Sequence, residues 1–274
     1  MRGPSASGSL PTEDQMNRNL LILATALLTT AGMAQTEYNF NWQRGIDANP
    51  EGLNDGAGRF EMARGSFNRA TNTFSFYGTF SANKGITPDG FWLVVSPGPN
   101  PKGHSSELAI FYLDASAGKK DVYVYGYNGV NGKNSFVDGS SASGTQAPDK
   151  IYSSRETPNA LLNFTNTYNA TTKTKTLGFS MDATVVQNHV PKYGTPQQKA
   201  DWTGAAFGEQ IGIWWHPVAN LSTATSGKYL SKFEYCEEGW FDGQAMPTNP
   251  VPEPATLFAL GAGLAAFARR RRRA

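Results

Sequence analysis

Apolar and polar side chains alternate along the segment Thr73–Phe80. Because successive side chains of a β-strand point to opposite faces, Phe74, Phe76 and Phe80 share one face of such a strand. The other face carries only hydroxyl-bearing side chains. A helix, with its period of about 3.6 residues, would not gather these phenylalanines on one side. The segment therefore predicts a strand whose phenylalanine face is buried.

Several other segments have strand character. Phe91–Val95 and Leu108–Leu113 are continuously apolar, which is typical of central strands that are covered on both faces. In Asp121–Tyr127 valines alternate with tyrosines, and Asn128-Gly129 follows as a type I′ hairpin signal. Further strands are predicted at Ala160–Phe164, Lys175–Met181, Gln210–His216 and Lys228–Tyr235.

One short helix is predicted at Ala183–His189. Asp182 can accept hydrogen bonds from the free N–H groups of its first turn, and Pro191 ends it. Eight or more strands within roughly 200 residues, with no repeat of about 20–50 residues, indicate an all-β fold. We predict a single β-sandwich of jelly-roll or lectin-like type over residues 36–245.

Composition excludes several classes of protein. The single cysteine, Cys236, excludes an internal disulfide framework and a multi-cysteine zinc site. It stands in a strand-like run, so we expect its side chain to be buried, and intermolecular disulfide pairing is the competing interpretation. Gln35–Pro250 contains 17 Lys and Arg against 19 Asp and Glu, a net charge of −2. This balance argues against a surface that binds nucleic acid.

The N-terminus has the parts of a secretory signal peptide. Arg18 precedes the uncharged run 20–30, and Ala34 is the small residue before the expected cleavage site. Met16 is then the natural start. We predict that residues 1–34 are an upstream extension plus a signal peptide, and that the chain is exported.

Residues 246–274 are predicted to be a linker and a membrane signal in three parts. The first part is Pro252-Glu253-Pro254, where the prolines keep the chain extended. The second, Ala255–Ala268, would form about 21 Å of helix, shorter than the ~30 Å hydrocarbon core. Snorkelling arginines and a locally thinned bilayer can cover this deficit. The third part is a stop-transfer cluster that resists translocation, Arg269, Arg270, Arg271, Arg272 and Arg273.

This order of parts resembles the PEP-CTERM sorting signal of Gram-negative bacteria over Val251–Ala274. The resemblance implies recognition by an exosortase, a membrane-embedded cysteine protease or transpeptidase, and processing at or near Pro252–Pro254. It implies an inner-membrane tether before processing, followed by delivery to the cell surface or the extracellular space. Gly90–Gly103 and Gly212–Pro217 are similar to ectodomains of other PEP-CTERM proteins, without an implied activity.

Motifs for catalysis are incomplete. Gly103–Glu107 begins like a nucleophile elbow, but Glu107 stands where glycine is required. A Ser–His–acid arrangement stays open because triads depend on geometry rather than order, and the histidines are His104, His189 and His216. Glycoside hydrolysis needs two carboxylates roughly 5–9.5 Å apart. The dense acidic cluster Glu234–Glu238 is explained more simply by solvated charges at a strand end. We predict no catalytic residues.

The segment Asp47–Gly52 starts like a calcium-binding loop, with oxygen-bearing side chains at alternate positions and glycine sixth. The twelfth position is Gly58, which cannot supply the closing bidentate carboxylate. A looser cage would still suit calcium, the one candidate cofactor, while a polar turn is the competing interpretation. The candidate ligands are Asp47, Asn49, Glu51 and Asn54 or Asp55.

Aromatic rings can pack on the C–H faces of sugars, and this chain has several aromatic residues that could serve this purpose. Tyr123 and Tyr125 lie opposite two valines, so either face of their strand could look outward. Burial in the core is the competing interpretation and is favoured for most of these rings. The aromatics in question are Tyr123, Tyr125, Tyr127, Trp214, Trp215 and Trp240, and all but Trp215 form the candidate binding set.

We therefore predict an exported cell-surface or matrix protein with a non-catalytic sandwich that binds or organises exopolysaccharide. Its expected partners are an exosortase, exopolysaccharide and, transiently, the inner membrane, but not nucleic acid. The alternative is a secreted polysaccharide-active hydrolase on a lectin-like sandwich. A purely structural role is the third interpretation.

Overall fold

The computed structural model describes residues 37–48, 50, 52–96, 109–126, 133, 135–136, 149–192, 196–200 and 210–247. All of these belong to one compact unit, Glu37–Asn249. The predicted signal peptide and the predicted sorting signal lie outside the described residues. The sandwich boundary at 36–245 stays a prediction.

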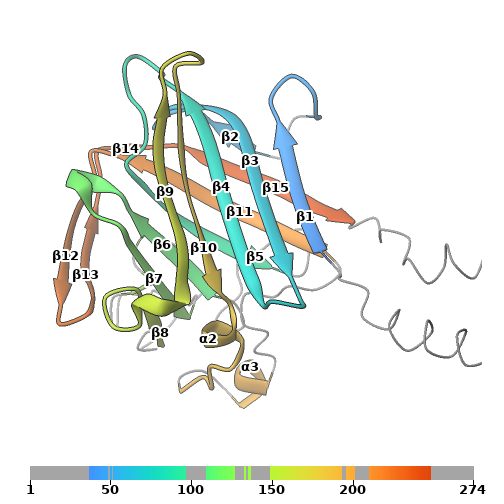
Figure 1. The fold of residues 1–274 in the computed structure, drawn as a ribbon, viewed down its shortest axis with the longest axis vertical. Coiled ribbons are helices and arrows are strands. Elements are labelled where there is room, and N and C mark those ends of the chain that lie inside the picture. Colours follow the sequence, from blue (N-terminus) through green and yellow to red (C-terminus); the bar gives the residue numbers. More distant parts are fainter. Residues whose placement is uncertain are drawn as a thin grey trace, which may run out of the picture. The chain divides into compact units, whose positions relative to one another are not determined.

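One sheet has five antiparallel strands in the order β1-β3-β4-β10-β9 (Figure 1). Its strands are β1 (Glu37–Gln43), β3 (Arg59–Asn68), β4 (Thr73–Ser81), β9 (Leu161–Asn169) and β10 (Thr174–Asp182). Tight turns connect β3 to β4 and β9 to β10. Strand β10 pairs with β4, so segments about 100 residues apart in the sequence are neighbours in the middle of this sheet.

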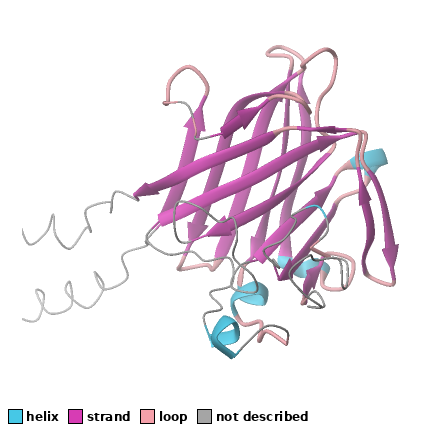
Figure 2. Cartoon of the chain, turned by 180° about the vertical axis from the view of Figure 1, so that it is seen from behind, coloured by secondary structure: helices cyan, strands magenta, loops and turns pink. Residues whose placement is uncertain are grey.

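The other sheet has eight antiparallel strands, with β2-β15-β11-β5-β6-β7-β8 as its main path and β14 paired to β11. Figure 2 shows its strands crossing those of the first sheet in a separate layer. Its strands are β2 (Gly52–Asn54), β5 (Gly90–Ser96), β6 (Ala109–Asp114), β7 (Asp121–Gly126), β8 (Lys150–Ser153), β11 (Gln210–Ala219), β14 (Glu237–Glu238) and β15 (Trp240–Pro247).

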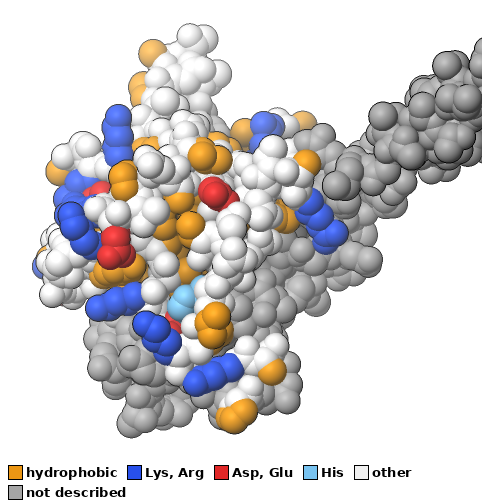
Figure 3. Space-filling model, turned by 60° about the horizontal axis from the view of Figure 1, so that its bottom comes forward, with side chains coloured by type: hydrophobic (Ala, Val, Ile, Leu, Met, Phe, Trp, Pro, Cys, Tyr) orange, Lys and Arg blue, Asp and Glu red, His pale blue; other side chains and the backbone are white. Residues whose placement is uncertain are grey.

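A separate hairpin and four short helices complete the described elements. The hairpin consists of β12 (Ser222–Ser226) and β13 (Tyr229–Glu234). The helices are η1 (Ser116–Gly118), η3 (Pro158–Ala160), α2 (Thr184–Gln187) and α3 (Pro196–Ala200). On the face drawn in Figure 3, Lys and Arg side chains are scattered among apolar and uncharged side chains, with acidic side chains and a histidine between them.

The core between the two sheets is dominated by aromatic rings. Trp215 of β11 is fully buried, and its ring lies 4.9 Å from Phe76 and 5.3 Å from Phe80. A Cβ at Gly78, which stands between these two phenylalanines, would lie 1.8 Å from the Trp215 ring. Glycine at this position is therefore what allows the indole to reach β4.

Most of the predicted strands are confirmed, and so is the all-β, two-sheet architecture. The phenylalanine face of β4 is buried, and β5 and β6 are covered on both faces. The predicted helix is shorter, α2, and the Asp182 Oδ1 accepts the N–H of Thr184 at 2.9 Å as expected. Cys236 is exposed, not buried, because β13 ends at Glu234 and the chain bends there. The Asn128-Gly129 turn lies outside the described residues.

Candidate functional site

A row of aromatic rings crosses the outer face of the eight-stranded sheet, opposite the core. His216 of β11 is in register with Trp92 of β5, Trp92 with Tyr112 of β6, and Tyr112 with Tyr123 of β7. At the other end Trp240, the first residue of β15, lies 6.5 Å from the His216 ring between centroids. We call these five side chains the aromatic row. It brings together residues that are up to 148 positions apart in the sequence.

The aromatic row passes from the interior to the surface. Tyr112 and Tyr123 are fully buried and Trp92 is 2% exposed, whereas the side chain of His216 is 13% exposed and Trp240 is 40% exposed. The row is therefore accessible only at its β11–β15 end. We call this end, with the neighbouring Trp214, the open end.

The closed end of the row is covered by the β12–β13 hairpin. The Phe233 ring lies 5.1 Å from Tyr112, and the backbone N–H of Leu230 donates to the Tyr125 hydroxyl at 2.8 Å. Burial raises the pKa of the Tyr123 and Tyr125 hydroxyls well above the usual value. Tyr123 and Tyr125 are both fully buried, as the favoured interpretation expects, so they form no exposed platform, and Tyr125 packs under the hairpin. Tyr127 lies outside the described residues.

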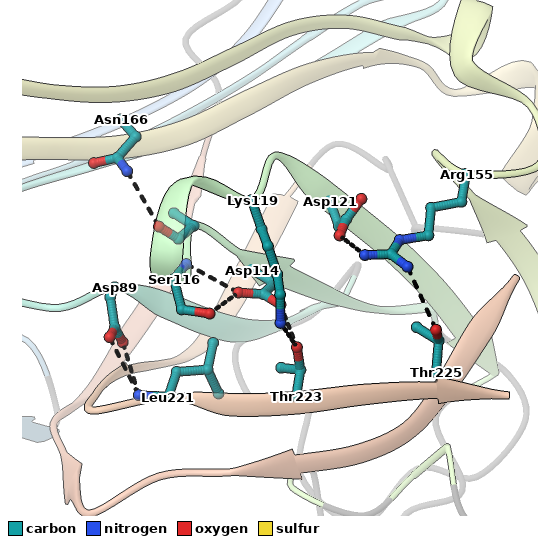
Figure 4. A network of polar contacts seen from close by, with 11 residues as sticks. Asp89, Asp114, Ser116, Lys119, Asp121, Arg155, Asn166, Leu221, Thr223 and Thr225 are labelled. Atoms are coloured by element: carbon teal, nitrogen blue, oxygen red, sulfur yellow. Dashed lines mark hydrogen bonds and ion pairs between the residues drawn. The ribbon is translucent and has the colours of Figure 1, made fainter.

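A buried carboxylate attaches the hairpin to the sheet (Figure 4). Asp114, at the end of β6, has no exposed side-chain surface. Its Oδ1 accepts the N–H and the hydroxyl of Ser116 at 2.9 and 2.6 Å, and its Oδ2 accepts the hydroxyl of Thr223 in β12. Lys119 Nζ lies 3.2 Å from the same Oδ2 and donates to the Thr223 oxygen at 2.6 Å. The negative charge is therefore fully compensated.

Two further contacts in Figure 4 join β12 to the sheet. Arg155 pairs with Asp121 at 2.6 Å and reaches the Thr225 hydroxyl at 3.4 Å. Asp89 accepts the backbone N–H of Leu221 with both carboxylate oxygens at 3.2 Å. Burial raises the pKa of Asp89, and the Leu221 hydrogen bond offsets only part of this effect. These carboxylates have structural partners, so the network acts as a clamp for the hairpin.

The open end has its own polar centre. The Nδ1 of His216 lies 2.7 Å from Glu238 Oε1, and the Tyr235 hydroxyl donates to the same oxygen at 2.7 Å. The His216 ring stacks on Trp92 with centroids 3.8 Å apart. Trp214 packs edge-on against both rings, at 4.8 Å from Trp92 and 5.4 Å from His216. The position of the imidazole is therefore fixed by three contacts: stacking on Trp92, edge-on packing with Trp214 and the hydrogen bond to Glu238.

The charge state of the open end follows from these contacts. Burial by itself would raise the pKa of Glu238, but the hydrogen bonds from His216 and Tyr235 outweigh it, so this pKa is lowered. Glu238 is therefore a carboxylate at neutral pH, and Nδ1 of His216 carries the proton that it accepts. Lys133 lies over the Tyr235 ring at 4.4 Å from the centroid. Within the described part of the chain, His216 Nε2 has no hydrogen-bond partner.

The other predicted site residues are dispersed. Asp47 accepts the N–H of Gln43 at 2.6 Å, and Asp55 forms a two-oxygen contact with the guanidinium of Arg44 at 2.7 and 2.9 Å. A cationic partner at Asp55 does not favour a calcium ion there. Among the residues that are described, no three His, Cys, Asp or Glu side chains form a cluster suited to a metal. Asn49 and Glu51 lie outside them, so the calcium cage stays a prediction.

The three histidines occupy separate places in the chain. His189 follows α2, with its Nε2 3.7 Å from Asp149 Oδ1, and His216 lies in the aromatic row. His104 lies outside the described residues. The Glu234–Glu238 cluster divides: Glu234 pairs with Lys232 at 2.9 Å, while Glu238 turns to His216.

Trp214 and Trp240 are candidate binding residues from the sequence, but the sequence does not predict which residues lie beside them. Trp92, His216, Tyr235 and Glu238 are the residues that sequence reasoning missed as a group. One sequence pattern could have located His216 together with Trp214, the alternation of side chains between the two faces of a strand. In Gln210–Ala219, Trp214 and His216 alternate with the core residues Ile213 and Trp215. This alternation places both on the outer face without any knowledge of the neighbouring strands.

Comparison with known proteins concerns the C-terminus. A family model described as the PEP-CTERM protein-sorting motif matches residues 250–273. No curated protein and no solved structure matches the chain. No helix in the described residues is long and apolar enough to cross a membrane, and the predicted membrane segment Ala255–Ala268 lies outside them. The chain carries a PEP-CTERM sorting motif, which implies that it is an exported protein sorted to the cell surface and processed by an exosortase.

Proposed function

We propose that this chain is a non-enzymatic cell-surface or matrix protein whose sandwich binds exopolysaccharide at the open end of the aromatic row. The observation that carries the proposal is the exposed Trp240 beside Trp214 and His216, where an otherwise buried row of rings reaches the surface. A lectin-like role for the two-sheet fold, a transient inner-membrane tether and final release at the cell surface belong to the same proposal.

The chemistry of the open end suits a sugar. A pyranose presents C–H groups on its faces and hydroxyls around its edge, so it can pack on an indole and also donate hydrogen bonds. Trp240 supplies the flat apolar surface, and Glu238 supplies an acceptor of fixed charge beside it. Because Trp92 and Trp214 hold the His216 ring, little side-chain freedom is lost when a ligand binds.

The charge of Glu238 argues against one of the two catalytic roles in glycoside hydrolysis, that of the general acid. A general acid in glycoside hydrolysis needs a carboxyl group whose pKa is raised, so that it holds a proton near neutral pH. The pKa of Glu238 is lowered by its hydrogen bonds from His216 and Tyr235. This direction supports a carboxylate that accepts hydrogen bonds from sugar hydroxyls. The competing hydrolase would release reducing sugars from the polymer, and we expect no such release.

The proposal is tested by retention on the exopolysaccharide of the producing bacterium. Trp240→Ala removes the exposed ring, and we expect it to weaken binding of the exported protein about tenfold, since one aromatic contact contributes up to ~1.5 kcal/mol. The control is Ile46→Ala in the turn after β1, which removes an apolar side chain that is more exposed than Trp240 (73% against 40%) and lies outside β9. Affinity electrophoresis of both variants, with thermal unfolding in parallel, makes the comparison.

Unchanged retention of Trp240→Ala would contradict the proposal, as would equal losses in the two variants. A fall in melting temperature that matches the loss of binding would also count against it. Repeating the wild-type measurement with a calcium chelator tests the candidate cofactor separately.

A further inference from the structure

The two sheets differ in how their edges end. In the eight-stranded sheet the edge strands are short, since β2 has 3 residues and β8 has 4. The five-stranded sheet ends on one side with β9, which has 9 residues and, among the strands that the structure describes, pairs with β10 alone. A long edge strand presents unpaired N–H and C=O groups along its free side, and another strand can add to it.

Over Asn163–Asn169, strand β9 carries no charged side chain, no proline and no bulge that would block such addition. Natural edge strands are protected by charged side chains, by proline or by a covering segment. Leu161–Asn169 contains no Lys, Arg, Asp, Glu or Pro. Leu162 is 54% exposed and Tyr168 is 63% exposed, so side chains near both ends of the strand are uncovered. Figure 1 shows β9 as the outermost strand of its sheet.

The strand is also regular over most of its length. Its pairing with β10 shifts only near Leu161, and the register is unbroken from Asn163 to Asn169. Within this stretch Asn166 faces the interior side, where its amide donates to the Ala115 carbonyl at 3.3 Å. Thr165 and Thr167 have the opposite parity and point to the outer face. The outer face at this edge is therefore uncharged and rich in hydroxyls.

We propose that β9 is a strand-pairing surface for a second copy of this chain, which adds its own β9 antiparallel about a twofold axis. A neutral strand meets no like-charge repulsion when it pairs with itself, and a twofold contact closes after two copies. The product is a continuous ten-stranded sheet. Because the sorting motif delivers every copy to one membrane, the copies meet at a raised local concentration. This inference does not depend on the sugar site.

The axis is expected at Asn166, the middle of the regular stretch, so Thr165 of one copy faces Thr167 of the other. Two variants use this geometry. Thr165→Lys with Thr167→Lys places like charges across the axis, and Thr165→Glu with Thr167→Glu does the same with the opposite sign. Each variant alone should dimerise at least roughly tenfold more weakly than the natural protein, because like charges opposite each other destabilise a strand pair.

An equimolar mixture of the two variants should regain dimerisation, since lysines then face glutamates. The measurement is sedimentation equilibrium of the exported protein over a concentration series. Thr79→Lys is the matched control, because Thr79 lies on the same face of the same sheet but in the central strand β4. It should dimerise like the natural protein. Recovery in the mixture also shows that the paired variants are folded.

Four results would overturn the inference. They are a natural protein that stays monomeric at its highest soluble concentration, variants that dimerise unchanged, a mixture that fails to recover, and open-ended filaments. Filaments would indicate head-to-tail addition of β9 to β1 of the next copy.

Discussion

At the scale of single residues, the open end depends on one hydrogen-bonded carboxylate. Glu238 accepts hydrogen bonds from His216 and Tyr235, and its pKa is lowered in the folded chain relative to the usual 4.5. A carboxyl group with a lowered native pKa stabilises the fold above its unfolded pKa. That contribution is lost as the pH falls through the native pKa.

Glu238→Gln tests this directly. The variant should be about 1 kcal/mol less stable at neutral pH, a modest figure because the carboxylate is partly exposed. The difference from the natural protein should shrink as the pH falls below about 4.5 and the natural carboxylate takes up its proton. Urea midpoints measured at several pH values make the comparison. A stability difference that does not change with pH would show that packing, not charge, explains it.

At the scale of elements, the β12–β13 hairpin decides which aromatics are accessible. It covers Tyr112 and Tyr125 at the closed end of the aromatic row, and the Asp114 network attaches it to the sheet. The hairpin itself has little apolar sequence, because β12 reads Ser-Thr-Ala-Thr-Ser. Its position therefore depends on the clamp and on the few rings of β13.

Asp114→Ala should loosen this hairpin. The substitution leaves the Ser116 N–H and the Lys119 ammonium without their buried acceptor, at a cost of about 3 kcal/mol. Exchange of the Leu230 amide hydrogen, which the Tyr125 hydroxyl protects, should accelerate strongly. Arg155→Ala removes a partly exposed pair, in which the Arg155 side chain is 37% and the Asp121 side chain 13% exposed, and should cost only about 1 kcal/mol. Equal effects of the two substitutions would mean that the buried carboxylate is not what attaches the hairpin.

Sequence reasoning succeeded for elements whose side chains follow a local pattern. β4 alternates, β5 and β6 are continuously apolar, and all three were predicted. It missed β1, whose aromatic residues alternate, and also β3, β8 and β15. It missed β2, β14 and β12 as well, because the first two are very short and the third is mostly Ser and Thr. Strands of that kind are determined by the partner that they pair with, and no local period indicates them.

At the scale of the whole molecule, the candidate site is a product of strand order. The aromatic row joins five strands whose sequence order differs from their order in the sheet, so His216 meets Trp92 only because β11 inserts between β15 and β5. Trp214 and Trp240 could be singled out as aromatics, but no sequence pattern specified this register. The burial of Tyr125 likewise depends on a hairpin about 100 residues further along the chain.

The spacing of the two sheets depends on Gly78. Gly78→Ala would place a methyl group 1.8 Å from the Trp215 ring, inside a core that has no room for it. We expect a loss of about 2–3 kcal/mol from overpacking. Gly65→Ala on β3, whose nearest neighbour would be the Phe76 ring at 3.3 Å, is the milder control. Denaturant unfolding compares the two, and a Gly78→Ala protein as stable as its parent would show that Trp215 can shift freely.

The gradient of exposure along the aromatic row also equips the protein with an optical reporter. Trp42, Trp92 and Trp215 are shielded from water, so their emission forms a constant background at short wavelength. Trp240 is the most exposed of the described indoles, and a saccharide that covers it displaces solvent from its ring. Binding should therefore be visible as a blue shift in intrinsic fluorescence, without any label, and the shift should vanish when that one indole is removed.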